Sequence, residues 1–445
     1  MEDNQSVTLF WFRRDLRLED NAGLYRALTQ GQNVQPVFIF DTNILSHLND
    51  KKDARVAFLH STVSLLKKEL IELGSDLLVY YGNPIDIIDN LVKTKNIIAV
   101  YTNHDFGAYP THRDTEVNSL LEKNNIVFKT YKDHVIFEKD EVVKDDGKPY
   151  TVFTPYKKKW LAKLTAKSLD GSSSYYFKSY PTEKYFEKFL KTNRPSESIT
   201  LQKMGFDTTD IFIPAAEVST TIIKKYDEQR DFPAIDGTSR LGIHFRFGTI
   251  SIRKKARKAI DLNATYLSEL IWRDFYAQIL YHFPHVEKNS FRPEYDQIKW
   301  RNNEEEFKAW QEGKTGYPIV DAGMRELMHT GHMHNRVRMI AASFLTKHLL
   351  IDWRWGEAWF AEKLLDFDLA SNNGGWQWAA GCGTDAAPYF RIFSPDAQTQ
   401  KFDKNLQYIK KWVPELSTSK YPKPIVDHKL ARERCLQTYK EGLNR

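Results

Sequence analysis

Hydrophobic and polar positions in the first third of the chain follow two alternating patterns. Short apolar runs rich in β-branched and aromatic residues, typical of strands buried on both faces, recur at Ser6–Phe12, Val34–Phe40, Leu77–Tyr81, Ile97–Tyr101 and Ile126–Tyr131. Between them the apolar residues return with the period of a helix, in Ala22–Leu28, Ala54–Leu73, Pro84–Val92 and Thr115–Leu121. Because crossovers between parallel strands are right-handed, this order predicts a doubly wound, parallel five-stranded α/β domain.

The pattern changes twice after these segments. It first weakens, and the turn-forming run Asp145–Pro149 and the flexible patch Gly171–Ser174 are typical of loops. After about residue 206 helical periods dominate, most clearly in Leu267–Phe283, Glu304–Gln311, Ile319–Met328, Asn335–Leu350 and Glu357–Leu365. The sequence therefore predicts an α/β domain over residues 1–132, an interdomain linker over 133–205 and an all-helical domain over 206–445.

Composition and charge exclude several classes of protein. With 41% hydrophobic and 27% charged residues among 445, the chain has the balance of a soluble globular protein. No apolar run approaches the roughly 20 residues that a membrane helix needs, and the acidic start Met1–Asn4 is not a secretory signal. Two cysteines cannot form a disulfide framework and fit a reducing compartment. The formal charge of +6 permits a polyanionic partner without requiring one.

Two loops bear on nucleotide binding. No G-x-G-x-x-G motif follows the first predicted strand, so the α/β domain lacks a dinucleotide fingerprint. In the helical domain, Gly237–Leu241 (GTSRL) combines two hydroxyls and a guanidinium with a flexible entry. Such a segment can cradle a phosphate with its N–H groups, and it can equally be a simple helix N-cap.

Two of the predicted helices carry unusual mixtures of side chains on one face. On the first, four residues at positions i, i+3, i+4 and i+7 share a side: Glu269, Trp272, Arg273 and Tyr276. On the second, Asn335, Arg338 and Met339 lie along one side. A carboxylate, an indole and a guanidinium together suit a planar, hydrogen-bonding guest. The alternative is an ordinary Glu–Arg pair beside a core tryptophan.

The segment Asp366–Ala380 (DFDLASNNGGWQWAA) has the least ordinary composition in the chain. Its two acids, two asparagines, two glycines and two tryptophans leave little for simple packing, and we interpret it as a ligand-facing segment. His329, His332 and His334 straddle Gly331 without a cysteine or carboxylate beside them. Because metal centres need a closer set of ligands, we expect no metal site there.

Read in order, these motifs resemble the DNA photolyase/cryptochrome family, and most closely its class I cyclobutane pyrimidine dimer photolyases. The resemblance covers nearly the whole chain. It rests on Phe10–Arg17 (FWFRRDLR), Thr238–Leu241, the Trp272-Arg273 helix, Gly316–Asp321 (GYPIVD), Met333–Met339, Asp366–Trp378 and Gly383–Arg391 (GTDAAPYFR).

The resemblance implies that the helical domain binds FAD in a bent form. Arg338 and Asp366 would pair beside the isoalloxazine, and Asn372 would face flavin N5. Where many relatives have serine at position 242 this chain has glycine. The implied cofactor-binding residues are Tyr226, Thr238, Ser239, Arg240, Leu241, Gly242, Trp272, Arg273, Arg338, Asp366, Asp368 and Asn372.

The implied reaction is light-dependent DNA repair. Reduced FAD, excited by blue or near-UV light, transfers an electron to a flipped-out cyclobutane pyrimidine dimer, which splits and returns the electron. Glu269, Asn335 and Asn372 are the implied catalytic residues, and Trp272 and Trp378 the stacking walls. The implied DNA-binding residues are Arg230, Glu269, Trp272, Tyr276, Asn335, Arg336, Met339, Trp378 and Gln398.

The family also accounts for the tryptophans, nine of which lie between Trp272 and Trp412. The resemblance implies that Trp376, Trp353 and Trp300 form a chain that carries electrons to oxidised flavin. The acidic residue by which folate-binding relatives hold an antenna pigment aligns near Gly107. The identity of a second, antenna chromophore in the N-terminal domain therefore stays open.

Two other activities occur among similar proteins. A signalling cryptochrome would use the same flavin without repair, but such relatives often lose pocket residues that this chain retains. A (6-4) photolyase would have histidine where Asn335 stands. We therefore expect a cytoplasmic, monomeric enzyme, associated with the nucleoid in a bacterium, whose partner is UV-damaged DNA containing cyclobutane pyrimidine dimers and not a membrane.

Overall fold

The computed structural model describes residues 5–165 and 177–444, and within them the chain forms two compact units. Unit 1 is built from Met1–Glu138, Ala162–Ala216 and Leu241–Lys258, and unit 2 from Lys139–Leu161, Glu217–Arg240 and Ala259–Arg445. The expected linker, residues 133–205, is thus divided between the two units. The domain boundaries at residues 132 and 206 stay predictions.

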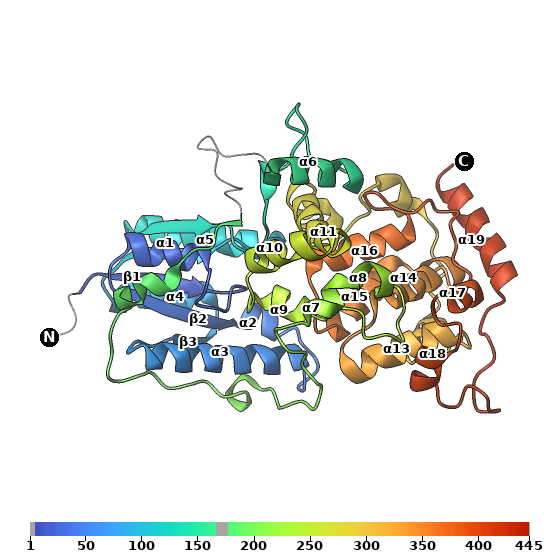
Figure 1. Cartoon of the computed structure of the whole chain (residues 1–445), viewed down its shortest axis with the longest axis horizontal. Helices are drawn as coiled ribbons and strands as arrows, with labels where there is room; N and C mark the ends of the chain where they lie inside the picture. The colour runs from blue at the N-terminus through green and yellow to red at the C-terminus, as the bar shows by residue number, and fades with distance from the viewer. Residues whose placement is uncertain (1–4, 166–176, 445) are drawn as a thin grey trace. The chain divides into compact units, whose positions relative to one another are not determined.

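Unit 1 contains the predicted sheet (Figure 1). Its strands are β1 (Val7–Phe12), β2 (Val34–Asp41), β3 (Leu78–Gly82), β4 (Ile97–Asn103) and β5 (Val127–Tyr131). They lie in the order β3-β2-β1-β4-β5 and every neighbouring pair is parallel. The prediction of a doubly wound parallel sheet is confirmed.

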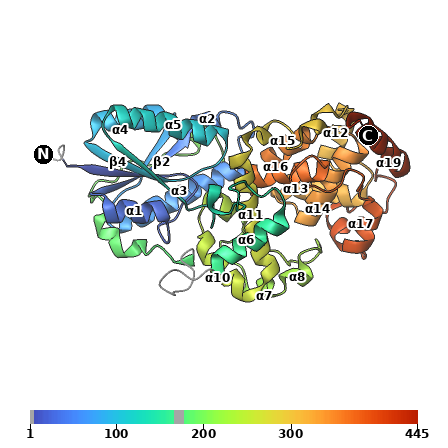
Figure 2. The ribbon, with the colours of Figure 1, turned by 90° about the horizontal axis from the view of Figure 1, so that it is seen from above.

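Helices cover both faces of this sheet, as Figure 2 shows. They are α1 (Ala22–Gln30), α3 (Ala54–Glu72), α4 (Pro84–Thr94) and α5 (Ala108–Lys123), with the single turn α2 (Thr42–Leu45) after β2. Alternate residues of β1 point to opposite faces of the sheet: Phe10 and Phe12 pack with α1 and α3, whereas Leu9 and Trp11 pack with α4 and α5. A strand buried on both sides explains the unbroken apolar run in its sequence.

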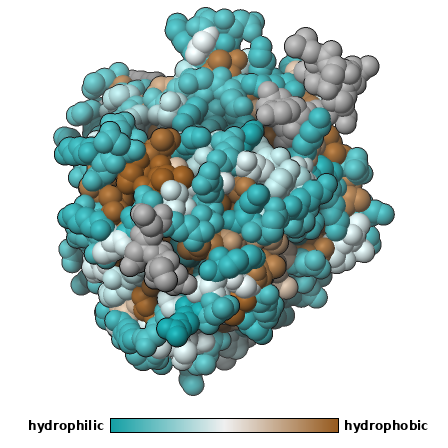
Figure 3. Space-filling model, turned by 90° about the vertical axis from the view of Figure 1, so that its left-hand side faces the viewer, coloured by the Kyte–Doolittle hydropathy of each residue, from teal (hydrophilic) through white to brown (hydrophobic). Residues whose placement is uncertain are grey.

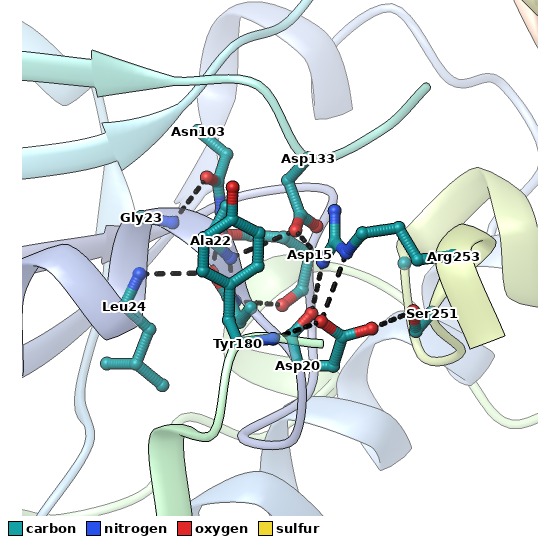
Figure 4. Close-up of polar contacts among 12 residues, drawn as sticks. Asp15, Asp20, Ala22, Gly23, Leu24, Asn103, Asp133, Tyr180, Ser251 and Arg253 are labelled. Carbon is teal, nitrogen blue, oxygen red and sulfur yellow. Dashed lines mark hydrogen bonds and ion pairs between the residues drawn. The ribbon is translucent and has the colours of Figure 1, made fainter. Parts of the chain in front are cut away.

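A buried network of charges joins later parts of the chain to the sheet (Figure 4). Asp20 accepts hydrogen bonds from the backbone N–H of Tyr180 (2.8 Å) and from Arg253 (3.0 Å). Arg253 also binds Asp133 (2.8 Å), which accepts further hydrogen bonds from Arg17 (2.7 Å) and from the N–H of Ala22 at the start of α1 (3.0 Å). Burial alone would raise the pKa of Asp133, but Arg17 and Arg253 outweigh it and lower that pKa to about 2. These contacts explain why segments near residues 180 and 253 belong to unit 1.

The carboxyl ends of β1 and β4, where doubly wound sheets usually bind ligands, are filled by ion pairs. Arg13 contacts Asp114 (2.5 Å), and Arg14 contacts Asp105 (2.8 Å). A cavity lined by Arg13, Arg14 and Asp105 among others has a volume of only about 10 Å³. Such a volume holds about one water molecule.

Unit 2 is helical. Its complete helices are α7 (Thr220–Lys224), α8 (Tyr226–Gln229), α11 (Ala264–His282), α12 (Glu304–Gln311), α13 (Pro318–Thr330), α14 (Asn335–Ser343), α15 (Trp353–Lys363), α16 (Leu369–Ala380), α17 (Pro395–Phe402), α18 (Gln407–Trp412) and α19 (His428–Gly442). The remaining helices α9 (Gly242–Phe247) and α10 (Ile252–Leu262) lie wholly or mainly in unit 1. None of the described helices is both long enough and apolar enough to span a bilayer.

Two predicted helices differ most from the structure, and one helix lies where none was predicted. The helix expected over Thr115–Leu121 begins seven residues earlier, directly after Gly107, whose φ of 112° favours glycine. The helix expected over Asn335–Leu350 ends at Ser343 and continues as the π-helical turn η7 (Phe344–His348). Helix α6 (Phe153–Thr165) lies inside the expected linker; its Trp160 is fully buried and donates to Asp274 (2.9 Å).

The π-helical turn places Lys347 in the core of unit 2. The side chain is 1% exposed; its Nζ donates to the carbonyl of Ala380 (2.8 Å) and lies 4.0 Å from the ring centre of Tyr439. Burial lowers the pKa of Lys347 to about 8. The Tyr439 hydroxyl donates to the same carbonyl (2.9 Å). The buried Lys347 cation and the Tyr439 hydroxyl thus share one acceptor, the carbonyl of Ala380 at the end of α16.

The face seen from the N-terminal side in Figure 3 is largely hydrophilic, with scattered apolar patches. Among the exposed apolar side chains of unit 1 are Leu65 on α3 and Val127 on β5. Single exposed apolar residues are normal on a protein surface.

Candidate active site

One cavity in unit 2 collects most of the site residues that the sequence predicts. Its volume is about 410 Å³, which is in the range of small-molecule sites. Helix α16 packs against both α11 and α14, and the three helices supply most of the wall. The lining residues are Arg230, Glu269, Trp272, Arg273, Tyr276, Asn335, Arg338, Met339, Ala342, Phe360, Leu364, Asp366, Phe367, Asp368, Ser371, Asn372, Gly375, Trp376 and Trp378.

The α11 side of the cavity is built on an aromatic stack. The ring of Trp272 lies parallel to that of Phe153, with centroids 3.7 Å apart, and stacks on Tyr276 at 5.3 Å. Asn263 caps the start of α11 by accepting from two backbone N–H groups. Because Phe153 supports one face of the indole, Trp272 is held as a rigid wall.

An ion pair lies on the same side of the cavity. Arg230 contacts the carboxylate of Glu269. Burial alone would lower the pKa of Arg230, but Glu269 outweighs it and the pKa is raised. Burial, with Asp385 and Glu269, also raises the pKa of Tyr276. The guanidinium therefore stays charged and the phenol stays protonated at neutral pH.

A second ion pair lies where α14 faces the segment before α16. One terminal nitrogen of Arg338 contacts both carboxylate oxygens of Asp366, at 2.9 and 3.1 Å, and its Nε donates to the Met333 carbonyl (2.7 Å). Burial alone would raise the pKa of Asp366, but Arg338 outweighs it and the net shift is downward. The pair thus places a fixed cation and a fixed anion at the cavity wall.

The segment that the sequence marked as ligand-facing forms helix α16. Asp368 caps it by accepting from the N–H of Ser371 (3.2 Å), and both residues line the cavity. Gly375 also lines it, and a Cβ atom added there would meet nothing within 4 Å. The wall is therefore open at Gly375, with room for a bound molecule beside the helix.

Trp376 joins the cavity to the core. Its ring centroid lies 4.9 Å from that of Phe360 and 6.1 Å from that of Trp310. The indole also packs closely on Gly356, where an added Cβ atom would lie 2.1 Å from it. Its Nε1 is buried without a hydrogen-bond partner in the described protein.

The remaining predicted site residues lie outside the cavity wall. Tyr226 and the loop Thr238–Gly242 come before helix α11 in the chain. Tyr226 is half-buried, and the Arg230 guanidinium lies over its ring. Arg336 pairs with Asp231 (2.8 Å) and covers the ring of Phe402 on α17. Gln398, also on α17, is half-buried. Trp353 begins α15 in the core, and Trp300 contacts Tyr439 (6.0 Å).

Two family models match the chain. Residues 8–172 match the model of DNA photolyase, and residues 266–420 match that of the FAD binding domain of DNA photolyase. The deoxyribodipyrimidine photo-lyase of Halobacterium salinarum is 36% identical, over 98% of this chain and 99% of its own. That of Escherichia coli is also 36% identical, over 97% and 98%.

The chain belongs to the DNA photolyase family. Solved structures of the family have the same fold. A class III photolyase from Agrobacterium tumefaciens matches with a TM-score of 0.84 and 32% identity, over 100% of this chain and 99% of its own. A Sulfolobus tokodaii photolyase with two FAD molecules gives 0.82 and 34%, over 98% and 100%. A Synechocystis cryptochrome gives 0.83 and 26%, over 98% and 100%.

The cavity fits the flavin of this family. An isoalloxazine needs hydrogen-bond partners along one edge and apolar contact on its faces. The Arg338–Asp366 pair supplies polar groups, and the wall open at Gly375 supplies space. Within residues 5–165 and 177–444, no group of three or more histidine, cysteine or acidic side chains is placed to hold a metal ion.

Several wall residues were not named individually by the sequence reasoning. Ala342, Phe360 and Leu364 were missed altogether, whereas Phe367, Ser371 and Gly375 fall inside the segment Asp366–Ala380 that it marked as ligand-facing. The apolar ones read as ordinary core positions of their helices, and no local pattern separates a core residue from one beside a cavity. The exception is Gly375, because a glycine inside a helix costs about 1 kcal/mol relative to alanine and therefore signals a special requirement.

Proposed function

We propose that the protein is a light-dependent DNA repair enzyme, a deoxyribodipyrimidine photolyase that uses FAD to split cyclobutane pyrimidine dimers. The observation that supports this most is the composition of one cavity. The same cavity is lined by residues implied to hold the flavin, such as Arg338 and Asp366, and by residues implied to hold the dimer, such as Glu269 and Asn335. Full-length relatives named as photo-lyases agree with it.

Bound, reduced FAD would supply the light-driven one-electron chemistry. In this proposal the carboxylate of Asp366 keeps the Arg338 guanidinium fixed beside the ring, where it favours negative charge. Asp368 and Asn372 would hydrogen-bond the ring edge. The rest of the cofactor would be held by Trp272, Arg273, Tyr226 and the loop of Thr238, Ser239, Arg240, Leu241 and Gly242.

The dimer would be drawn out of the duplex into the same cavity, at a cost that a lesion reduces because it stacks and pairs poorly. Trp272, fixed against Phe153, would stack on it opposite Trp378. Glu269 and Asn335 would hydrogen-bond the bases, with Met339 and Tyr276 beside them. Flanking phosphates would be held by Arg230, Arg336 and Gln398.

A repair assay tests this proposal. The reduced, purified protein is mixed with a thymine oligonucleotide containing dimers and illuminated with blue or near-UV light. We expect thymine absorbance to recover in the light and not in the dark. Bound FAD without recovery would contradict the proposal and favour a cryptochrome-type photoreceptor.

The electron chain gives a separate prediction. We expect Trp376→Phe to slow light-driven reduction of oxidised flavin while leaving repair by pre-reduced enzyme largely unchanged, because indole is the oxidisable group and phenylalanine keeps the packing on Phe360. Photoreduction is followed by flavin absorbance with an external thiol as reductant. Trp412→Phe, outside the proposed chain of Trp376, Trp353 and Trp300, is the control. Equal loss of both activities would refute this separation of roles.

Other features of the proposal follow from the resemblance. We infer a class I enzyme that is monomeric and cytoplasmic, with a nucleoid association in a bacterium and an α/β domain that ends near residue 132. A second chromophore bound in the N-terminal domain is part of the proposal, with its identity open. An absorption spectrum of the purified protein, with identification of the released pigments, tests it.

A further inference from the structure

A groove on unit 2 is lined by residues of α12, α13 and α15 and shares no lining residue with the cavity of the candidate active site. Its volume is about 670 Å³, within the range of small-molecule sites. The apolar part of its lining consists of Phe307, Met328, Trp355 and Trp359. The three rings are half-buried, and Met328 is 42% exposed. Aromatic side chains thus remain in reach of a ligand, and we call this site the α12 groove.

The charged residues of the α12 groove cancel one another. Two acids and two bases line it: Glu304, Glu312, Lys308 and Lys314. Glu312 contacts Lys314 (2.8 Å) and Lys308 (4.0 Å), so the charges are paired where they lie. The two carboxylates and the amide oxygen of Gln311 are hydrogen-bond acceptors. The groove therefore suits a neutral, planar molecule whose hydroxyl groups donate hydrogen bonds.

A run of aromatic rings joins the α12 groove to the cavity of the candidate active site. Trp376 lines that cavity, and its ring centroid lies 6.1 Å from that of Trp310. Phe307 lies 5.8 Å from Trp310 on one side and 5.2 Å from Trp355 on the other. Trp310 is fully buried, and its Nε1 donates to the carbonyl of Ala341 (3.1 Å), which fixes the ring. Two indoles with one ring between them thus connect the groove to Trp376.

We propose that the α12 groove binds a neutral hydroquinone and that Trp355 and Trp310 pass its electron to Trp376. The proposal rests on the proposed function in one respect, because the final electron acceptor is oxidised flavin. For each electron that Trp376 gives to the flavin, the hydroquinone loses one electron and releases one proton to water. Two of the resulting hydroquinone radicals disproportionate to one hydroquinone and one quinone. Phe307 is the packed bridge between the two indoles and is not itself oxidised.

Equilibrium dialysis tests the binding step. The purified holoprotein is dialysed in the dark, without oxygen, against methylhydroquinone as the probe. We expect saturable binding whose affinity falls roughly two- to tenfold in Trp359→Leu, the worth of one aromatic contact. Trp355→Phe keeps a ring in the groove and should bind the probe like the wild type. Trp412→Leu, outside the groove, is the matched control. Absence of saturable binding, or equal binding in Trp359→Leu and the wild type, would overturn the proposal.

Photoreduction of the flavin tests the electron route separately from binding. The assay uses a Trp300→Phe background, which removes the last member of the chain proposed above, and compares methylhydroquinone with dithiothreitol, a reductant without an aromatic ring. We expect methylhydroquinone to sustain photoreduction better than the thiol. Adding Trp355→Phe or Trp310→Phe should abolish that advantage while the probe still binds. An undiminished advantage in both double variants would overturn the proposal.

The two tests separate this proposal from the proposed function. Dialysis measures binding of the probe and does not depend on repair. Loss of repair with normal binding of the probe would count against the proposed function and leave the groove assigned. Normal repair without binding of the probe would remove the hydroquinone site and leave the proposed function intact.

Discussion

Gly375→Leu should give a protein that folds at least as stably as the original chain and fails to retain FAD. Gly375 lies inside α16, where leucine is favoured over glycine by roughly 0.5–1 kcal/mol. Its added side chain would project into the open space of the cavity. Overfilling a site costs about 1–3 kcal/mol, which corresponds to a roughly 5- to 150-fold weaker affinity for flavin.

Two measurements on the same preparation check this expectation. Flavin content is read from absorbance after reloading with FAD, and stability from urea unfolding without flavin. Gly375→Ala is the matched control, because it gains helix propensity while adding only a Cβ that meets nothing within 4 Å. We expect the alanine variant to keep its flavin. If the leucine variant bound FAD normally, the cavity beside Gly375 would not be the flavin site.

Lys347→Met should stabilise the folded protein by about 2 kcal/mol at pH 7 and by much less above pH 10. The pKa of Lys347 is about 8 in the folded protein against 10.5 for an unperturbed lysine. That difference is worth about 3 kcal/mol, from which we subtract about 1 kcal/mol for the lost hydrogen bond. Tyr439 still donates to the Ala380 carbonyl, so the substitution leaves no orphaned acceptor.

The sign of the pH dependence follows from proton binding. Below pH 8 both the folded and the unfolded chain hold the Lys347 proton, and the folded chain bears the full cost of a buried charge. Between pH 8 and 10.5 only the unfolded chain holds it, so wild-type stability gains from this group as pH rises. Urea unfolding of both proteins at several pH values measures the difference, with the exposed Lys308→Met as control. A stability gain independent of pH would rule out this explanation.

The cavity of unit 2 combines two kinds of polar group. Arg338 with Asp366, and Arg230 with Glu269, are charged pairs whose partners hold each guanidinium in place. Asn372 is neutral and is oriented by a carboxyl group that lies outside the cavity wall. A site fixed by such supporting contacts loses little energy to rearrangement when a ligand binds.

The α/β fold was determined largely by local sequence. The five strands and four of the helices of unit 1 follow from apolar periodicity, because the central strands β1 and β2 are buried along their whole length and each helix packs one face on the sheet. Local pattern failed where tertiary contacts decide the structure. Helix α6 is stabilised by burial of Trp160 against Asp274, which no spacing within residues 153–165 reveals. The π-helical turn at Lys347 likewise depends on Ala380 and Tyr439, far away in the sequence.

The candidate site divides in the same way. The residue types and their spacing on single helices, as in Glu269 and Trp272 or Asn335 and Arg338, were readable from the chain because they follow the period of a helix. Their meeting in one cavity was decided only by how α11, α14 and α16 pack. Packing also decided that Phe153 stacks on Trp272 and that Asn372 donates a hydrogen bond to Glu357. A sequence specifies which groups one helix can present together; only packing brings groups from distant segments within hydrogen-bonding distance.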